Sequence, residues 1–175
     1  MRSRANIFGA GYPAPPAAVE GGAGELPPMW ALPPGKVRTV TFPSVLGQVR
    51  PVRAYDYNGP AGDRVGPTDI TSARGISGIR HASNGLFLTG VFLADAPPST
   101  APPRLDVTKE TVTLVSPQLG QTFFVGDGKG RSFRAPMGAT RLFLGFADGA
   151  DYRGAPGYYN NNDGELFVVV DVEVS

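Results

Sequence analysis

The sequence predicts an all-β protein with the architecture of an antiparallel β-sandwich. Gly and Pro account for 24 and 18 of its 175 residues, a density of helix breakers that leaves little room for long helices. The segments between these breakers are short and rich in Val, Thr and Phe, which favour strands. In the second half of the chain such segments recur at intervals of about 8 to 12 residues with turn residues between them, as is typical of a sandwich.

Length and composition bound the remaining possibilities. The 175 residues are most simply one domain. The 16 basic and 15 acidic residues give a net charge of +1 and are scattered along the chain, so we expect no nucleic-acid partner, which would need clustered Lys and Arg. The chain has no cysteine, which excludes disulfides, zinc-thiolate sites and thiol catalysis.

Residues 1–28 are rich in Ala, Gly and Pro, and we expect an N-terminal arm, extended or draped over the surface, before a core domain of residues 29–175. Ile7 and Phe8 are adjacent large apolar residues near its start, so a short first strand there stays open as an alternative. The basic start of the chain is followed by a segment broken by Gly and Pro, so we expect neither a classical signal peptide nor membrane insertion.

The strands of the core domain are then predicted in order. Residues 37–42 alternate as a half-buried strand does. Residues 47–71 contain a strand or two and a long polar loop, whereas residues 85–93 are almost entirely apolar, as in a central strand covered on both faces. Residues 94–103 form a Pro-rich surface loop. The later strands are expected at residues 111–115, 121–125, 132–135, 141–147 and 165–174.

The segment between the last two predicted strands is dense in oxygen ligands. Carboxylates and amides come from six side chains, and five Gly and Pro residues provide bends: Asp148, Asp151, Asn160, Asn161, Asn162, Asp163, with Gly149, Gly154, Pro156, Gly157, Gly164. Oxygen ligands without His or Cys are typical of a Ca²⁺ site. The same residues are also ordinary in hairpin turns, and composition alone leaves both interpretations open.

Other chemistry is less well supported. An EF-hand is excluded, because placing Gly164 sixth in the loop puts Tyr159 first and Val170 twelfth, where that motif needs carboxylates. His81 is the only histidine and has no nucleophile motif around it. Pairs such as Asp148 and Asp151 resemble the two carboxylates of a glycosidase, but the neighbouring amides favour a cation over proton transfer.

Two segments resemble the bacterial PA-I-type galactophilic lectins, a family of calcium-dependent proteins with a galactose-binding-like, jelly-roll β-sandwich. Residues 156–164, PGYYNNNDG, resemble the family's calcium and sugar loop, and residues 59–67, GPAGDRVGP, resemble its upstream segment. Tyr55 stands where the family has the tyrosine of its first calcium loop, and residues 34–37 resemble its early Pro-Gly turn. The resemblance covers residues 30–174, and the C-terminal loop is its most specific part.

The resemblance implies a ligand set for the metal and for the sugar. The metal ligands would be Asp148, Asn161 and Asn162 through side chains and Tyr55 and Tyr158 through backbone carbonyls. Residues 149–155 separate Asp148 from Pro156, a much longer link than in the family, so Asp151 is an alternative to Asp148. The implied sugar contacts are Asp148, Asn161, Pro67, Asp69 and Tyr159.

Two sugar-contacting side chains of the family, a His and a Gln, fall on Gly66 and Asp69 here. We therefore expect calcium binding to survive better than a preference for galactose. The resemblance implies a carbohydrate-binding protein without catalysis that binds sugar hydroxyls through Ca²⁺, is a homo-oligomer, and acts outside the cell or at its surface. The alternative is a calcium-stabilised assembly subunit of an extracellular oligomer or filament, for which the N-terminal arm and the lost sugar contacts are the support.

Overall fold

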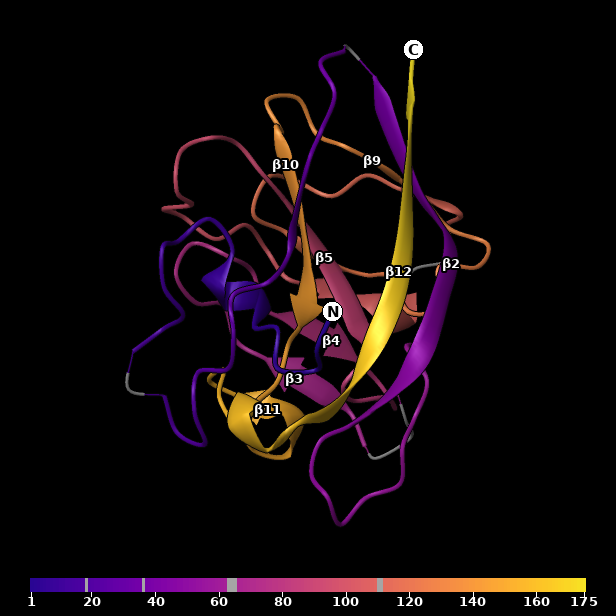
Figure 1. Ribbon diagram of the computed structural model, residues 1–175. Helices are drawn as coiled ribbons and strands as arrows, with labels where there is room; N and C mark the ends of the chain where they lie inside the picture. Colours follow the sequence, from indigo (N-terminus) through magenta and orange to yellow (C-terminus); the bar gives the residue numbers. More distant parts are fainter. Residues whose placement is uncertain (18, 36, 63–65, 110–111) are drawn as a thin grey trace.

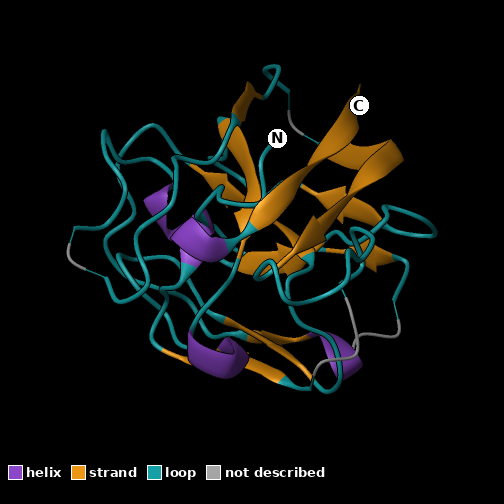
Figure 2. Ribbon diagram, turned by 60° about the horizontal axis from the view of Figure 1, so that its bottom comes forward, coloured by secondary structure: helices purple, strands orange, loops and turns teal. Residues whose placement is uncertain are grey.

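The computed structural model describes residues 1–17, 19–35, 37–62, 66–109 and 112–175, and it is mostly β-structure (Figures 1 and 2). Four short 3-10 helices occur in these residues: η1 (Ile7–Gly9), η2 (Val107–Lys109), η3 (Ala150–Tyr152) and η4 (Tyr159–Asn161). None of the described helices has the length and apolar character needed to cross a membrane. The strands form three sheets of four strands each.

The central sheet has the order β1-β10-β5-β8 and is antiparallel throughout. Its strands are β1 (Met29–Ala31), β10 (Arg141–Phe146), β5 (Leu88–Leu93) and β8 (Thr122–Phe124). All six residues of β5 are buried, which confirms the prediction of a central strand covered on both faces. The two faces of β5 and β10 enter two different apolar clusters, because successive side chains in a strand point in opposite directions.

The ribbon sheet has the order β12-β2-β9-β7 and is dominated by two long antiparallel strands, visible in Figure 1 as the yellow and purple ribbons. Its strands are β12 (Asp163–Val174), β2 (Arg38–Arg50), β9 (Ser132–Arg134) and β7 (Leu114–Val115). The register of β2 and β12 shifts once, where two residues of β2, Phe42 and Pro43, lie opposite Val170 alone. Proline has no N–H to donate, so a bulge at this position avoids a broken ladder bond.

The small sheet has the order β11-β3-β4-β6 and lies at the bottom of Figure 1. Its strands are β11 (Arg153–Gly154), β3 (Thr68–Ile70), β4 (Ile79–His81) and β6 (Leu105–Asp106). β11 belongs to the long link between Asp148 and Pro156, and it pairs in parallel with β3. The pairs β4/β6 and β7/β9 are also parallel, so the small sheet and the ribbon sheet are mixed, where the sequence predicted antiparallel pairing only.

Two apolar clusters hold the sheets together. One contains Leu142, Leu144 and Phe146 of β10 together with Val40 and Phe42 of β2, so one face of the central sheet packs on the ribbon sheet. The other is shared by the second face of the central sheet, the small sheet and the N-terminal segment, and its members include Ile7, Phe8, Ile70, Ile79, Phe87, Val91 and Phe143. The central sheet is therefore covered on both faces.

The N-terminal segment differs from the expected surface arm. Ile7 and Phe8 are both 0% exposed and belong to the second cluster. They lie in η1 rather than in a strand, with Asn6 capping the turn through its side chain. Gly145 of β10 allows this approach, because a Cβ there would meet the backbone of Ala5 at 2.8 Å. Residues 5–10 are thus part of the core.

Candidate functional site

The candidate site is built on the link between β10 and β12. The ring of Tyr159 is fully buried, and its hydroxyl donates to the carbonyl of Phe146 (3.0 Å) and accepts from the N–H of Asp148 (3.1 Å). The N–H of Gly157 donates to the carbonyl of Asp148 (3.0 Å). These bonds hold the two ends of the link together, so the residues after β10 and those before β12 share one place.

Asp148 is the buried acid of this link, with 3% of its surface exposed. Its Oδ1 accepts from the N–H of Gly149 and its Oδ2 from Nδ2 of Asn162, both at 2.8 Å. Burial raises the pKa of Asp148 to about 7 despite these two hydrogen bonds, which lower it. A carboxylate buried in this way is stabilised as an anion by a bound cation.

Asn162 lies beside Asp148 and is 1% exposed. Its Nδ2 also donates to the carbonyl of Ser3 (3.3 Å), but its Oδ1 has no hydrogen-bond partner. The hydroxyl of Ser3 is likewise buried without a partner. Buried polar atoms are rarely left unpaired in folded proteins, and an orphaned amide oxygen beside a buried carboxylate is the kind of donor set that Ca²⁺ uses.

A cleft of about 400 Å³ opens over this link. It gathers five of the six residues that the sequence analysis assigned to the metal: Tyr55, Asp148, Asp151, Tyr158 and Asn161. Tyr55 reaches it from the connection between β2 and β3. The sixth residue, Asn162, contacts Asp148 directly. Both of the alternative acids, Asp148 and Asp151, line the cleft, and they differ in that Asp148 is buried and Asp151 is exposed.

The backbone around the cleft is strained. Asp151 (φ 48°), Tyr152 (φ 57°) and Tyr158 (φ 65°) have left-handed conformations although none is glycine, and all three line the cleft. Such conformations cost free energy and cluster at functional sites. Left-handed residues bend the chain sharply, and such bends suit a loop that binds a cation partly through backbone oxygens.

The N-terminal segment encloses the link from outside, which sequence reasoning missed. The N–H groups of Tyr158, Tyr159 and Asn160 donate to the carbonyls of Glu20, Gly22 and Gly21, respectively. The side chain of Asn160 accepts from the N–H of Gly24 (3.0 Å), and Nε of Arg4 donates to the carbonyl of Asn162 (3.1 Å). A Gly-rich segment carries no local pattern that indicates such long-range backbone pairing.

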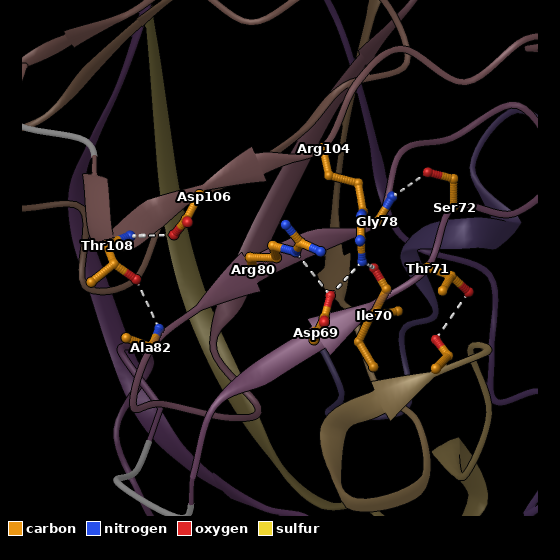
Figure 3. A network of polar contacts seen from close by, with 11 residues as sticks. Asp69, Ile70, Thr71, Ser72, Gly78, Arg80, Ala82, Arg104, Asp106 and Thr108 are labelled. Atoms are coloured by element: carbon orange, nitrogen blue, oxygen red, sulfur yellow. Dashed lines mark hydrogen bonds and ion pairs between the residues drawn. The ribbon is translucent and has the colours of Figure 1, made fainter.

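Two of the residues expected to contact sugar lie elsewhere. Pro67 and Asp69 line a separate cleft of about 350 Å³ beside the small sheet. The carboxylate of Asp69 accepts from Arg80 (3.0 Å) and Arg104 (2.5 Å), as Figure 3 shows. The hydrogen bond from Arg80 is the main cause of the lowered pKa of Asp69; burial opposes it, and the hydrogen bond and charge of Arg104 lower the pKa further. Asp69 is therefore an ion-pair partner within the small sheet.

The predicted sugar contact of Tyr159 is also wrong, because its ring has no exposed surface and cannot stack on a sugar. The neighbouring Tyr158 is half-buried and lines the cleft. Asp63, Arg64 and Val65 of the upstream segment and Lys36 of the early turn lie outside the described residues.

The donor set of the link relies on amides and carbonyls as much as on acids. In the part of the chain that the structure describes, no three His, Cys, Asp or Glu side chains gather as a metal cluster. The residues that are present, one buried carboxylate, one exposed carboxylate, two amides and backbone carbonyls, fit the oxygen coordination of Ca²⁺. Comparisons of the chain with family models, with curated proteins and with solved structures found no match.

Proposed function

We propose that the protein is a calcium-dependent carbohydrate-binding protein of the PA-I-type lectin kind, with a galactose-binding-like β-sandwich and no catalytic activity. The observation that carries this proposal is the buried pair of Asp148 and Asn162, with an unpaired amide oxygen, beside a cleft lined by Tyr55, Asp151 and Asn161. The central and ribbon sheets, packed face to face, support the sandwich.

Calcium links this site to sugar by coordination chemistry. Ca²⁺ takes 6–8 oxygen ligands, and protein groups at a surface cleft leave positions open. Two neighbouring hydroxyls of a sugar fill such positions, and a ligating carboxylate accepts their protons in charge-assisted hydrogen bonds. Asp151 and Asn161 reach the open side of the cleft, and the half-buried ring of Tyr158 offers an apolar surface to the sugar ring.

The sugar contacts in this proposal differ from those implied by the resemblance. Pro67 and Asp69 line another cleft and Tyr159 is buried, so none of the three contacts the sugar. Asp148 and Asn161 remain. We place the protein outside the cell or at its surface, where modules with weak calcium sites are loaded.

Calcium titration into metal-stripped protein tests the proposal. Calorimetry of the wild type is expected to give one calcium site. A calcium concentration about 100 times Kd adds about 2.7 kcal/mol to the free energy of unfolding. Asn161→Ala removes a ligand and abolishes this response. Asn160→Ala is the matched control, because Asn160 is exposed and bonds only to the N-terminal segment. A glycan array with calcium and with chelator then tests sugar binding, and a melting temperature indifferent to calcium contradicts the proposal.

The assembly subunit remains the second candidate because of one surface feature. Leu46 and Phe167 lie directly opposite each other across β2 and β12 and are 64% and 68% exposed, and Val169 on the same face of β12 is 53% exposed. β12 is also the outer strand of its sheet, and an exposed apolar edge favours association. The glycan array distinguishes the candidates, because an assembly subunit associates in sedimentation but binds no sugar with or without calcium.

A further inference from the structure

A second cleft adjoins the proposed calcium cleft. It has a volume of about 370 Å³ and is lined by Arg4, Arg53 and the polar residues 160–163. Val52 and Asn161 line both clefts. The two clefts therefore adjoin at Val52 and Asn161, with Asp148 lining the first and the two arginines lining the second, and we call the pair the groove.

The arginine end of the groove carries positive charge that the protein does not neutralise. Arg4 and Arg53 are exposed, and neither forms a salt bridge within the described part of the chain. Asp163, the acid that lines this cleft, is already engaged: its Oδ2 accepts from Arg50 at 2.7 and 3.1 Å and from the hydroxyl of Tyr57 at 2.9 Å. Arg4 and Arg53 line the same cleft as this carboxylate, but its salt bridge is with Arg50.

The two arginines come from distant parts of the chain. Arg4 belongs to the N-terminal segment, where its Nε donates to the carbonyl of Asn162, so one edge of its guanidinium is fixed by the calcium link. Arg53 follows β2, and its backbone carbonyl accepts from Arg50. Among the described residues its guanidinium acts on Tyr57 through its charge but has no hydrogen bond or salt bridge. Its side chain is therefore available to a ligand.

We propose that the ligand of this groove is an anionic saccharide, with its hydroxyls on the calcium and a carboxylate or sulfate group between Arg4 and Arg53. This inference rests on the proposed function. Guanidinium groups bind carboxylate and sulfate through paired hydrogen bonds, whereas a neutral sugar offers them no charge. Each cleft falls within the range of about 300–1,000 Å³ that holds a small ligand, so the groove accommodates more than one sugar ring.

The test compares two probes that share one sugar scaffold and differ in charge. Digalacturonic acid and its dimethyl ester have the same ring stereochemistry, and esterification removes both negative charges. Each is titrated by calorimetry into the full chain saturated with calcium at low ionic strength. The acid is expected to bind about 3- to 10-fold more tightly than the ester. A sulfated galactose disaccharide in a third arm distinguishes sulfate from carboxylate as the preferred group.

Variants at Arg53 connect the preference to the groove. Arg53→Gln is expected to reduce the preference for the acid to about 2-fold or less while leaving the affinity for the ester unchanged, and Arg53→Lys restores part of it because it keeps the charge. Arg134→Gln is the matched control, since Arg134 is exposed on β9 at the other end of the molecule (Figure 1). Added salt weakens binding of the acid more than binding of the ester.

The outcomes separate this inference from the proposed function. Equal affinity for the acid and the ester in calcium overturns the arginine site and leaves the calcium bridge standing, as does an Arg53→Gln variant that weakens both probes equally. An acid that keeps its affinity and its dependence on Arg53 in chelator supports the arginine site and refutes the calcium bridge. No binding of any of the three probes in calcium overturns the anionic saccharide.

Discussion

The side chains of Asp148 and Asn162 share a hydrogen bond of 2.8 Å although 14 residues separate them and both are almost completely buried. Asp148 follows β10 directly and Asn162 precedes β12, so the pair joins the central sheet to the ribbon sheet. A buried acid at such a junction makes the stability of the metal-free protein depend on pH.

Stability of the metal-free protein is expected to fall as pH rises from about 4 to 7. The folded-state pKa of Asp148 is about 7, above the value of about 3.9 in an unfolded chain. Between these two pKa values the folded state therefore holds a proton that the unfolded state has released. The free energy of unfolding falls by up to about 1.4 kcal/mol for each pH unit in this range. Below about pH 4 the contribution of Asp148 to the free energy of unfolding is fully present, and above about pH 7 no more of that free energy is lost. Urea denaturation at several pH values measures it.

Asp148→Asn removes this titration, so its free energy of unfolding is expected to vary less with pH than that of the wild type. Asp171→Asn is the control, because Asp171 is exposed on β12. Identical pH profiles for the wild type and Asp148→Asn contradict the raised pKa of this buried acid.

Tyr159→Phe is expected to destabilise the protein by about 1–3 kcal/mol. The variant leaves the carbonyl of Phe146 and the N–H of Asp148 without the hydroxyl that pairs both. It also loosens the calcium link, so the affinity for calcium falls with stability. Tyr55→Phe is the control for stability, since Tyr55 is 54% exposed. Equal melting temperatures for the two variants would falsify this account of the link.

Phe8→Ala is expected to cost about 3–5 kcal/mol, the usual range for a buried phenylalanine. Phe8 has no exposed surface and packs in the cluster shared by the central and small sheets. Deletion of residues 1–10 is expected to unfold the domain. Met137→Ala, at a side chain that is 94% exposed, is the control in the same denaturation experiment. A truncated chain with native circular dichroism and an unchanged melting temperature refutes the prediction.

Phe167→Lys is expected to weaken self-association without lowering stability. The substitution places a charge in the exposed apolar pair with Leu46, and a lysine on an edge strand opposes further pairing. Sedimentation velocity across a range of concentrations measures the effect. Met137→Lys adds the same charge at an isolated apolar side chain, and an equal change in both variants argues against an interface on β12.

Periodicity predicted the main strands because it records which faces are buried. The alternation in residues 165–174 and the apolar run of residues 85–93 correspond to β12 and β5. The parallel pairs of the small sheet could not be predicted in this way, since pairing direction depends on where distant segments lie. The burial of Ile7 and Phe8 was hidden by the surrounding Gly, Ala and Pro, which indicate a loop locally but also let backbones approach closely.

Residue spacing found part of the candidate site for a similar reason. Oxygen-rich composition located the link between β10 and β12, and the resemblance added Tyr55, which reaches the same cleft. The resemblance failed for Asp69, because the pairing of β3 with β4 brings Arg80 against this acid. It also failed for Tyr159, since nothing in a Tyr-Tyr pair indicates which ring faces the core. Arg4 reaches the cleft that Arg53 lines only because the N-terminal segment folds against the link.

The contact between the two ends of the chain has a consequence for biosynthesis. Met1 and Ser3 pair with residues 164–166 of β12, and residues 5–8 pack on β10. A ribosome releases the N-terminal segment long before it has made these partners, so Ile7 and Phe8 stay exposed until β10 and β12 have been synthesised. Contacts this distant in sequence slow folding, and exposed apolar segments of incomplete chains aggregate. We expect this protein to fold after synthesis rather than during it, and to depend on chaperones in the interval.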